Sequence, residues 1–323
     1  MKLTATLAAL IGLAATALPA AAQDRYPSRP IRFVVPFAAG GPSDIVARIV
    51  APHMAATLGQ PVIVDNRAGA GGVTGVDAIA KAAGDGYTFG IGSAGALAIS
   101  PHLNRGTPYN PVTDLAPITL AVLVPEPLVV PGASPFRSLQ DLIADARARP
   151  GALNFGSTGS GSMPHLAAEQ LRAAANIDIV NIAYNSGGQL ATAILRNEVQ
   201  LGFADLPVLL PNIEAGTMRA LAVGTPERMP WLPEVPTFAE LGLPSVDASN
   251  WHGLVAPART QAEPLAMLRR AAIAALQDQE VRHRLNQQGA VPGGNSPEAF
   301  GAFIASEGRK WGDVIRRNNI TAD

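Results

Sequence analysis

Short apolar runs rich in β-branched residues alternate along this chain with longer segments whose apolar residues recur every three or four positions. The first pattern is typical of buried strands, and the second is typical of helices that bury one face. Strands are predicted at residues 31–36, 62–66, 87–91, 128–130, 153–155, 179–182, 201–204, 220–223 and 253–256. Helices are predicted at residues 43–58, 75–82, 139–148, 163–174, 189–196, 206–215, 262–277, 279–287 and 297–317. This alternation favours an α/β fold over an all-β fold.

The first of the predicted helices contains a proline. Ile45, Ile49 and Met54 lie near one face of residues 43–58, as expected for a helix that packs on a core. Pro52 has no amide hydrogen and its ring crowds the preceding turn, so it is expected to kink or break this helix.

Two proline-rich stretches indicate how the chain is divided. "LAVLVPEPLVVPGASPFRSL" begins at Leu120 and "PSVDASNWHGLVAPA" begins at Pro244, and each contains an apolar run with Pro or Gly on either side. We expect these runs to be strands that cross between two lobes, so that the chain leaves the first lobe near Glu126 and returns near Trp251. Lobe 1 would then comprise residues 23–125 and 251–323, and lobe 2 residues 126–250, with a ligand cleft between them.

A strand, a turn of small residues and a helix follow one another twice. The two copies are "FVVPFAAGGPSDIVARIV", from Phe33, and "LNFGSTGSGSMPHLAAEQL", from Leu153. A glycine-rich turn that leads into a helix exposes backbone N–H groups and the positive end of the helix dipole, so both turns suit an anion. The first turn by itself could be a simple bend between strand and helix. The second consists of seven small residues, 156–162, and is open to close approach by a ligand.

Nucleotides fit these turns poorly. No Gly-Lys-Ser or Gly-Lys-Thr occurs in the chain, so the phosphate-loop motif is absent. The glycines at 156, 159 and 161 have the reverse of the spacing in the dinucleotide fingerprint. A small anion such as a carboxylate needs fewer contacts than the phosphates of a nucleotide and therefore matches the turns better.

The sequence also lacks the common catalytic and zinc motifs. No serine near the turns has the flanking glycines of G-x-S-x-G, and the five histidines never form H-x-x-x-H or H-E-x-x-H. Asp205 follows a predicted strand, where it could either cap the next helix or face the cleft and receive a ligand amine. His165 and His252 are expected to make structural hydrogen bonds, with a role in the cleft as the alternative.

The N-terminus and the composition narrow the class of protein further. Residues 1–22 have Lys2 before an apolar run and small residues before Gln23, which predicts a secretory signal peptide. Cleavage after Ala22 leaves 301 residues with 23 Lys and Arg against 25 Asp and Glu, a balance that offers no basic surface for nucleic acid. The chain has no cysteine, which excludes disulfides, thiolate metal sites and a cysteine nucleophile. No segment of the mature chain is expected to span a membrane.

Four segments together resemble the extracytoplasmic solute receptors of tripartite tricarboxylate transporters, the Bug family. They are "YPSRPIRFVVPFAAGGPSDIVARIVAPHM", "LGQPVIVDNRAGAGGVTGVDAIAKAAGDGYTF", "NFGSTGSGSMPHLAAEQL" and "AGTMRALAVGTPERMPWLPEVPTFAELG". The resemblance covers essentially the whole mature chain. It implies a periplasmic receptor with the two-lobe, type II periplasmic-binding-protein fold, which closes on a small organic acid and delivers it to a membrane permease. We expect a monomer without cofactor, metal, nucleic-acid partner or enzymatic activity.

The resemblance also implies which residues surround the ligand. In this family the carboxylate is held mainly by backbone groups and bridging waters at the two strand–turn–helix motifs. The matching positions in the first lobe are Phe37, Ala38, Ala39, Gly40, Gly41, Ser43, Asp44, Ser93 and Ala94. The matching positions in the second lobe are Gly156, Ser157, Thr158, Gly159, Ser160, His165 and Asp205.

The chain departs from the family pattern at several of these positions. Relatives often have proline at Ala38 and Ala39, Asn at Asp205, and Lys or a similar polar residue near Asn185. An acid at 205 would repel a second ligand carboxylate unless the ligand also carried an amine. An amino acid, an aromatic acid or a nicotinate-like monocarboxylate therefore becomes an option beside the di- and tricarboxylates.

Two other functions remain open from the residues alone. One is a secreted enzyme acting on a small acid, with Ser157 or Ser160 and His165 as its reactive pair. The other is a receptor that presents its bound ligand to a signalling partner.

Overall fold

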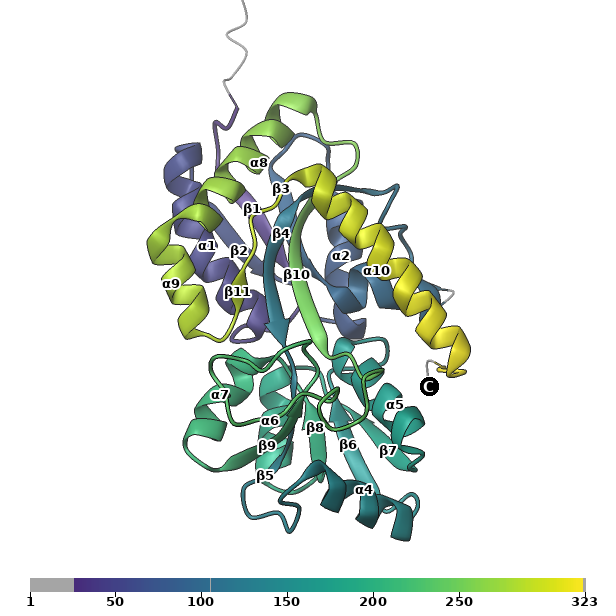
Figure 1. Cartoon of the computed structure of the whole chain (residues 1–323). Helices are drawn as coiled ribbons and strands as arrows, with labels where there is room; N and C mark the ends of the chain where they lie inside the picture. Colours follow the sequence, from purple (N-terminus) through teal and green to yellow (C-terminus); the bar gives the residue numbers. More distant parts are fainter. Residues whose placement is uncertain (1–25, 105, 322–323) are drawn as a thin grey trace, which may run out of the picture.

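A computed structural model describes residues 26–104 and 106–321. The predicted signal peptide, residues 1–22, lies outside the described residues. The chain forms two β-sheets, each covered by helices on both faces, one above the other in Figure 1. The predicted α/β fold is confirmed.

The larger sheet, sheet A, has six strands in the order β11-β4-β10-β3-β1-β2. In chain order they are β1 (Ile31–Val35), β2 (Val62–Asn66), β3 (Thr88–Ser93), β4 (Leu115–Pro125), β10 (Ser249–Pro257) and β11 (Val291–Pro292). β1 runs parallel to β2 and β3, whereas β10 runs antiparallel to both β3 and β4. Parallel strands bring their carboxyl ends, and the turns that follow them, to one edge of the sheet.

Alternate residues of sheet A pack into different cores, because successive side chains of a strand point to opposite faces. Phe33 and Val35 pack with α1 (Pro42–Leu58), α8 (Ala262–Gln277) and α9 (Gln279–Gln287). Val34 packs on the other face, where α2 (Val73–Ala80), a π-helix at Gly95–Ile99, α3 (Ser100–Leu103) and α10 (Pro297–Arg317) lie. A short 3₁₀ turn, η1 (Ala70–Gly72), precedes α2.

The smaller sheet, sheet B, has five strands in the order β7-β6-β8-β5-β9. They are β5 (Pro127–Pro131), β6 (Leu153–Ser157), β7 (Ile179–Ala183), β8 (Leu201–Phe203) and β9 (Met218–Val223). α4 (Leu139–Ala148) and α5 (Met163–Ala175) bury one face, and α6 (Gly187–Leu195) and α7 (Leu206–Glu214) bury the other.

The chain passes between the sheets at one narrow place. It leaves sheet A after Pro125, enters sheet B at Pro127, and returns to sheet A at the start of β10. The outgoing and returning segments are paired there, with Pro125 opposite Ser249 and the N–H of Glu126 donating to the carbonyl of Ala248 at 2.9 Å. Two hydrogen-bonded segments between two sheets are the usual form of a hinge. The lobe boundaries at 125/126 and 250/251 stay predictions that fall at this place.

Most of the predicted elements are present with bounds shifted by one or two residues. Several elements are missing from the prediction. β4 was missed because its prolines Pro117 and Pro125 interrupt the apolar pattern, and β11, η1, the π-helix and α3 are too short to give a periodic pattern. Pro52 does not break α1, which continues to Leu58. Pro52 and Arg48, whose carbonyl loses its partner, are both exposed, so that carbonyl faces solvent.

Candidate functional site

The first turn joins β1 to α1, and hydrogen bonds to the carboxyl group of Asp44 hold its conformation. Oδ2 of Asp44 accepts hydrogen bonds from the N–H of Gly40 at 2.9 Å and from Nε of Arg48 at 2.8 Å. Its Oδ1 accepts one from Nδ2 of Asn66 at 3.0 Å, and the same amide also donates to the carbonyl of Phe37. Burial alone would raise the pKa of Asp44, but these hydrogen bonds outweigh it and hold that pKa below its ordinary value. Asp44 therefore shapes the turn.

The second turn joins β6 to α5. Gly159 has a φ of +110°, a conformation that favours glycine, and a Cβ there would lie 3.7 Å from the backbone nitrogen of Gly71 in η1. His165 accepts a hydrogen bond at Nδ1 from the N–H of Gly161 at 3.3 Å and fixes the turn from its helix side. Ser162, at the N-cap of α5, is 4% exposed, and its hydroxyl has no hydrogen-bond partner among the described residues.

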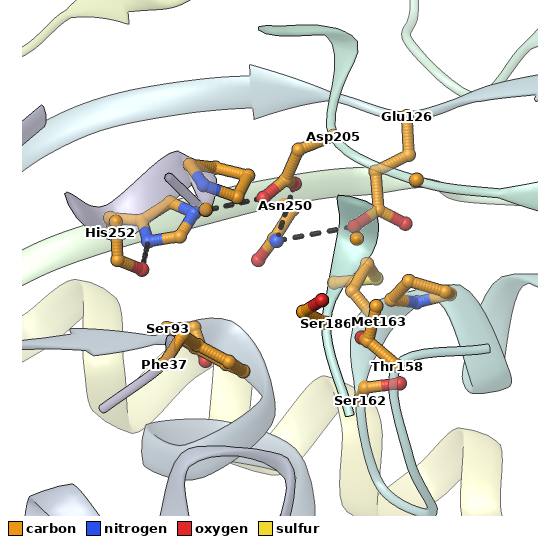
Figure 2. Close-up of a pocket in the computed structure, with 16 residues that line it drawn as sticks. Phe37, Ser93, Glu126, Thr158, Ser162, Met163, Ser186, Asp205, Asn250 and His252 are labelled. Atoms are coloured by element: carbon orange, nitrogen blue, oxygen red, sulfur yellow. Dashed lines mark hydrogen bonds and ion pairs between the residues drawn. The ribbon is translucent and has the colours of Figure 1, made fainter. Parts of the chain in front are cut away.

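The two turns meet at a small inner chamber, shown in Figure 2. Its free volume is about 30 Å³, and it is lined from both sheets. The lining residues are Phe37, Gly41, Pro42, Ser43, Ser93, Glu126, Thr158, Ser162, Met163, Pro164, Ser186, Gly187, Ala204, Asp205, Asn250 and His252. The first turns of α1 and α5 thus lie at the same chamber.

A wider outer chamber of about 440 Å³ adjoins it, and Phe37 and Thr158 line both. The other residues of the outer chamber are Ala68, Gly69, Ala70, Gly71, Gly72, Val73, Ser100, Leu103, Asn104, Gly159, Ser160, Ala183, Tyr184 and Asn185. The turn η1 and the second turn approach each other closely here. A Cβ added to Gly71 would lie 3.3 Å from the carbonyl oxygen of Ser160.

A hydrogen-bonded network of buried polar side chains connects the two sheets at the inner chamber. Nδ2 of Asn250 donates to Oδ1 of Asp205 at 2.7 Å and to Oε1 of Glu126 at 3.2 Å. Nε2 of His252 lies 3.3 Å from Oδ2 of Asp205, and its Nδ1 lies 2.7 Å from the hydroxyl of Ser43. Asp205 belongs to the sheet B side, whereas Asn250 and His252 belong to β10 of sheet A. These hydrogen-bonded side chains therefore connect the two sheets.

Glu126 is the most deeply buried acid of this group. It lies at the crossing between β4 and β5 and is 1% exposed. Burial raises the pKa of its carboxyl well above the ordinary value, and the neighbouring Asp205 carboxyl raises it further. Its Oε2 accepts no hydrogen bond from any N–H or hydroxyl group of the described residues.

Neither chamber is lined by lysine or arginine among the described residues. An anion bound here would have to be held by backbone N–H groups, hydroxyls and the dipoles of α1 and α5. Nor do those residues contain a group of three or more His, Cys, Asp or Glu side chains placed to hold a metal ion. No helix in the described part of the chain is long and apolar enough to cross a membrane.

Half of the site residues predicted from sequence line one of the chambers. These are Phe37, Gly41, Ser43, Ser93, Thr158, Gly159, Ser160 and Asp205. The other half, which line neither chamber, are Ala38, Ala39, Gly40, Asp44, Ala94, Gly156, Ser157 and His165. Contact of the first group with a ligand stays a prediction.

Several residues of the second group have identifiable structural roles. Asp44 and His165 hold their turns, as described above. Gly156 lies under the second turn, where a Cβ would come within 2.0 Å of Cδ1 of Leu190. Ala94 is fully buried and begins the π-helix. Asp205 occupies the N-cap position of α7 without a side-chain cap, and its carboxyl faces the chamber instead.

Glu126, Asn250 and Ser162 were missed as chamber residues by the sequence reasoning. Glu126 does carry a signal, because it is a single acid inside the apolar run "VLVPEPLVV". A charged residue in a run that should be buried requires a partner or a function.

The arrangement of two α/β sheets around a shared cavity defines a two-lobe periplasmic binding protein, and solved structures agree. One described as a periplasmic transporter is 36% identical, covers 92% of this chain and 100% of that one, and superposes with a TM-score of 0.88. MatC from Rhodopseudomonas palustris, solved with bound malate, is 31% identical with a TM-score of 0.86, covering 90% of this chain and 100% of that one. R. palustris Rpa4515 with adipate is 34% identical with a TM-score of 0.88, covering 92% of this chain and 99% of that one.

Sequence comparison identifies the family within this class. Residues 46–320 match the tripartite tricarboxylate transporter family receptor. Protein BugT of Bordetella pertussis (strain Tohama I) is 40% identical over 318 residues, which cover 98% of this chain and 97% of BugT. The chain therefore belongs to the tripartite tricarboxylate transporter receptor family, and the resemblance seen in its sequence is confirmed.

Proposed function

We propose that this protein is a periplasmic receptor that captures a small organic carboxylate between its two lobes for a tripartite tricarboxylate-type permease. The observation that carries the proposal is the convergence of the first turns of α1 and α5 on one chamber, where the buried hydroxyl of Ser162 has no hydrogen-bond partner. A helix N-terminus favours a negative charge, and a buried hydroxyl without a partner is costly unless a ligand engages it.

The ligand carboxylate is expected at the inner chamber and the rest of the ligand in the outer one. Ser43, Ser93 and Ser162 supply hydroxyls at the inner chamber, and the absence of lysine and arginine there suits one carboxylate better than a densely charged phosphate. The outer chamber, at about 440 Å³, is within the size range of small-molecule sites. Malate and adipate in two related receptors are ligands of this size and chemistry.

Capture is expected to occur by closure about the crossing at Glu126. A ligand shifts the balance between open and closed forms only through contacts that differ between them. A carboxylate in the inner chamber would touch both turns, and these belong to different sheets. The ligand therefore stabilises the closed form, which a permease can then distinguish from the open one.

The proposal is tested by identifying what the mature protein binds. Mass spectrometry of molecules that co-purify with it, followed by a thermal-shift screen of organic acids, should reveal at least one carboxylate ligand. At a concentration of about 100 Kd such a ligand stabilises the folded state by about 2.7 kcal/mol. A screen in which amines, sugars or nucleotides raise the melting temperature and no organic acid does so would refute the proposal.

An enzymatic function has one observation in its favour, the row formed by Ser43, His252 and Asp205. A hydroxyl, an imidazole and a carboxylate in sequence are the parts of an activated nucleophile. Ser43 and His252 are almost completely buried, however, beside a chamber of about 30 Å³. The reactive pair considered from sequence, Ser157 or Ser160 with His165, has less support: Ser160 lines the outer chamber, but Ser157 and His165 line neither chamber. We expect no turnover of p-nitrophenyl acetate or of a bound acid, and turnover abolished by Ser43→Ala would reverse this conclusion.

A further inference from the structure

Two carboxyl groups share the wall of the inner chamber opposite the turns. Glu126 comes from the crossing between the sheets and Asp205 from the junction of β8 and α7, and they are 1% and 8% exposed. Figure 2 shows both side chains directed toward Asn250, whose single amide group donates to each of them. Asn250 is the only side-chain amide among the described residues that line the chamber, so one amide group serves both carboxyls.

One oxygen of this pair, in a residue that lines the chamber, is an unused acceptor. Oε2 of Glu126 receives no N–H or hydroxyl donor from the described residues, whereas Oε1 has Asn250 and Oδ2 of Asp205 has His252. A carboxyl oxygen that faces another carboxyl can be hydrogen bonded only while one of the two holds a proton. The hydrogen bonding of the two carboxyl groups is therefore satisfied either by one proton that they share or by a donor group of a ligand.

The charged groups around the pair do not supply that donor. His252 contacts Asp205 from β10, and Asp247 adds a second negative charge near Glu126. Asp247 is itself paired with Lys310 of α10 at 2.6 Å, and Lys310 also pairs with Glu307 at 3.0 Å. Burial and the charge of Asp205 both raise the pKa of Glu126, which is the response of an acid that lacks a cation.

We propose that the acid pair Glu126–Asp205 binds a positively charged nitrogen of the ligand, so that the ligand class is an amino-carboxylate and not a dicarboxylate. This inference rests on the receptor function proposed above and specifies its ligand. The carboxylate and the ammonium group then both lie in the inner chamber, the carboxylate at Ser43 and Ser162 and the ammonium group as donor to Oε2 of Glu126 and to Asp205, so that only the side chain of the ligand extends into the outer chamber. The ammonium replaces the shared proton of the pair, which is released. A second carboxylate at this wall would face two acids and no cation.

Proton linkage distinguishes this arrangement from its main competitor. If an ammonium displaces the shared proton, binding releases a proton and becomes tighter as the pH rises from about 5 to 8. If Glu126 instead stays protonated and donates to a second ligand carboxylate, binding requires the proton and weakens over the same range. The two arrangements therefore predict opposite slopes of affinity against pH.

The experiment compares matched ligands on the mature protein by calorimetry. L-glutamate is paired with glutarate, and L-2-aminoadipate with adipate, at several pH values and in two buffers of different ionisation enthalpy, so that the members of each pair differ by the amine alone. We expect the amino member of at least one pair to bind at least tenfold more tightly and to release a proton. Tighter binding of both dicarboxylates, or proton uptake by the amino ligands, overturns the inference while leaving the receptor function intact. Failure of these four and of every other organic acid overturns the receptor function itself, and the inference with it.

Variants locate the effect in the acid pair. Glu126→Gln keeps the side-chain shape and removes the titrating oxygen, so the ratio of amino-acid to diacid affinity should shift at least tenfold toward the diacid. Asp205→Asn should shift it in the same direction and serves as the second variant if Glu126→Gln does not fold. The matched control is Glu214→Gln, an exposed acid at the end of α7. An unchanged ratio in both chamber variants, with native circular dichroism, also overturns the inference.

Discussion

At the scale of single residues, the chamber combines groups that are poorly satisfied by the protein itself. Within the described residues, the hydroxyl of Ser162 and Oε2 of Glu126 are buried without a hydrogen-bond partner, whereas Asp44 has three hydrogen bonds. Buried polar groups in proteins are nearly always satisfied, and exceptions gather at functional sites. The contrast separates Asp44, which builds a turn, from Ser162 and Glu126, which we propose to contact the ligand.

Ser162 gives the clearest test at this scale. Ser162→Ala removes a hydroxyl that makes no hydrogen bond within the described residues, so the free energy of unfolding should change by less than about 0.5 kcal/mol. The affinity for the carboxylate ligand should fall roughly tenfold, which is the effect of losing one good hydrogen bond of about 1.4 kcal/mol. Titration calorimetry and urea unfolding measure the two effects. A variant that is destabilised but binds normally would show that the hydroxyl is structural.

Glu126 gives a second test through the dependence of stability on pH. Because its pKa is raised in the folded state, the folded protein holds a proton that the unfolded chain has already lost. The contribution of Glu126 to stability therefore falls as the pH rises from the ordinary carboxyl range toward the raised pKa. Glu126→Gln should lose less stability than the wild type between about pH 5 and pH 8 in urea unfolding without ligand. Parallel curves for the two proteins would contradict this expectation.

At the scale of elements, the second turn depends on how closely β6 and α6 approach each other. Gly156 lies in β6 against Leu190 of α6, and the absence of a side chain at 156 permits that contact. The role of this glycine is therefore packing, although its sequence context suggested a ligand contact. A close approach at the base of the turn sets the position of the hydroxyls above it.

Gly156→Ala should destabilise the protein by about 1–3 kcal/mol, because its Cβ would lie 2.0 Å from Cδ1 of Leu190 and the core must shift. The matched control is Gly188→Ala in α6, where an added Cβ meets nothing within 4 Å. Alanine is the better helix former, so this control should be neutral or stabilising by up to about 1 kcal/mol. Thermal unfolding of both variants tests the contrast, and equal effects would contradict it.

At the scale of the whole molecule, the two sheets are joined by a paired crossing and by contacts between side chains at the inner chamber. The crossing, which is the proposed hinge, lies at Glu126 and Ala248, and the contacts include the pairs formed by Asp205 with Asn250 and His252. Met163 and Leu166 of α5 also pack in a core that belongs mainly to sheet A. Ligand binding and closure are therefore expected to be a single coupled event.

A disulfide across the cleft tests this coupling, since the chain contains no other cysteine. Gly71→Cys and Ser160→Cys place two thiols at the point where the sheets approach, with the Cβ at 71 expected 3.3 Å from the carbonyl oxygen of Ser160. The oxidised double variant should exchange ligand at least tenfold more slowly than its reduced form, because the closed form cannot open. Each single variant is the control. Exchange at the same rate in both redox states of the cross-linked protein would show that opening at this place is not needed.

The sequence by itself determined the features that depend on neighbouring residues. Apolar periodicity and helix-start signals such as Ser296 before Pro297 predicted most of the elements, because these are local preferences of the backbone and of solvent exposure. The two glycine-rich turns and the likeness to a receptor family were also visible along the chain. Half of the predicted site residues line the chambers, since the turns that carry them follow directly from strand and helix.

Only the tertiary structure decided which side chains meet. Glu126 and Asn250 are 124 residues apart in the chain, and Ser43 and His252 are 209 apart, yet both pairs are hydrogen bonded. No local preference encodes such contacts, because they arise from the packing of the two sheets around the crossing between them. The same packing places Asp205, which the sequence allowed as a helix cap, beside Glu126 in the wall of the chamber. The physical reason is that burial and charge partners belong to the folded arrangement, and these set the chemistry of a carboxyl group.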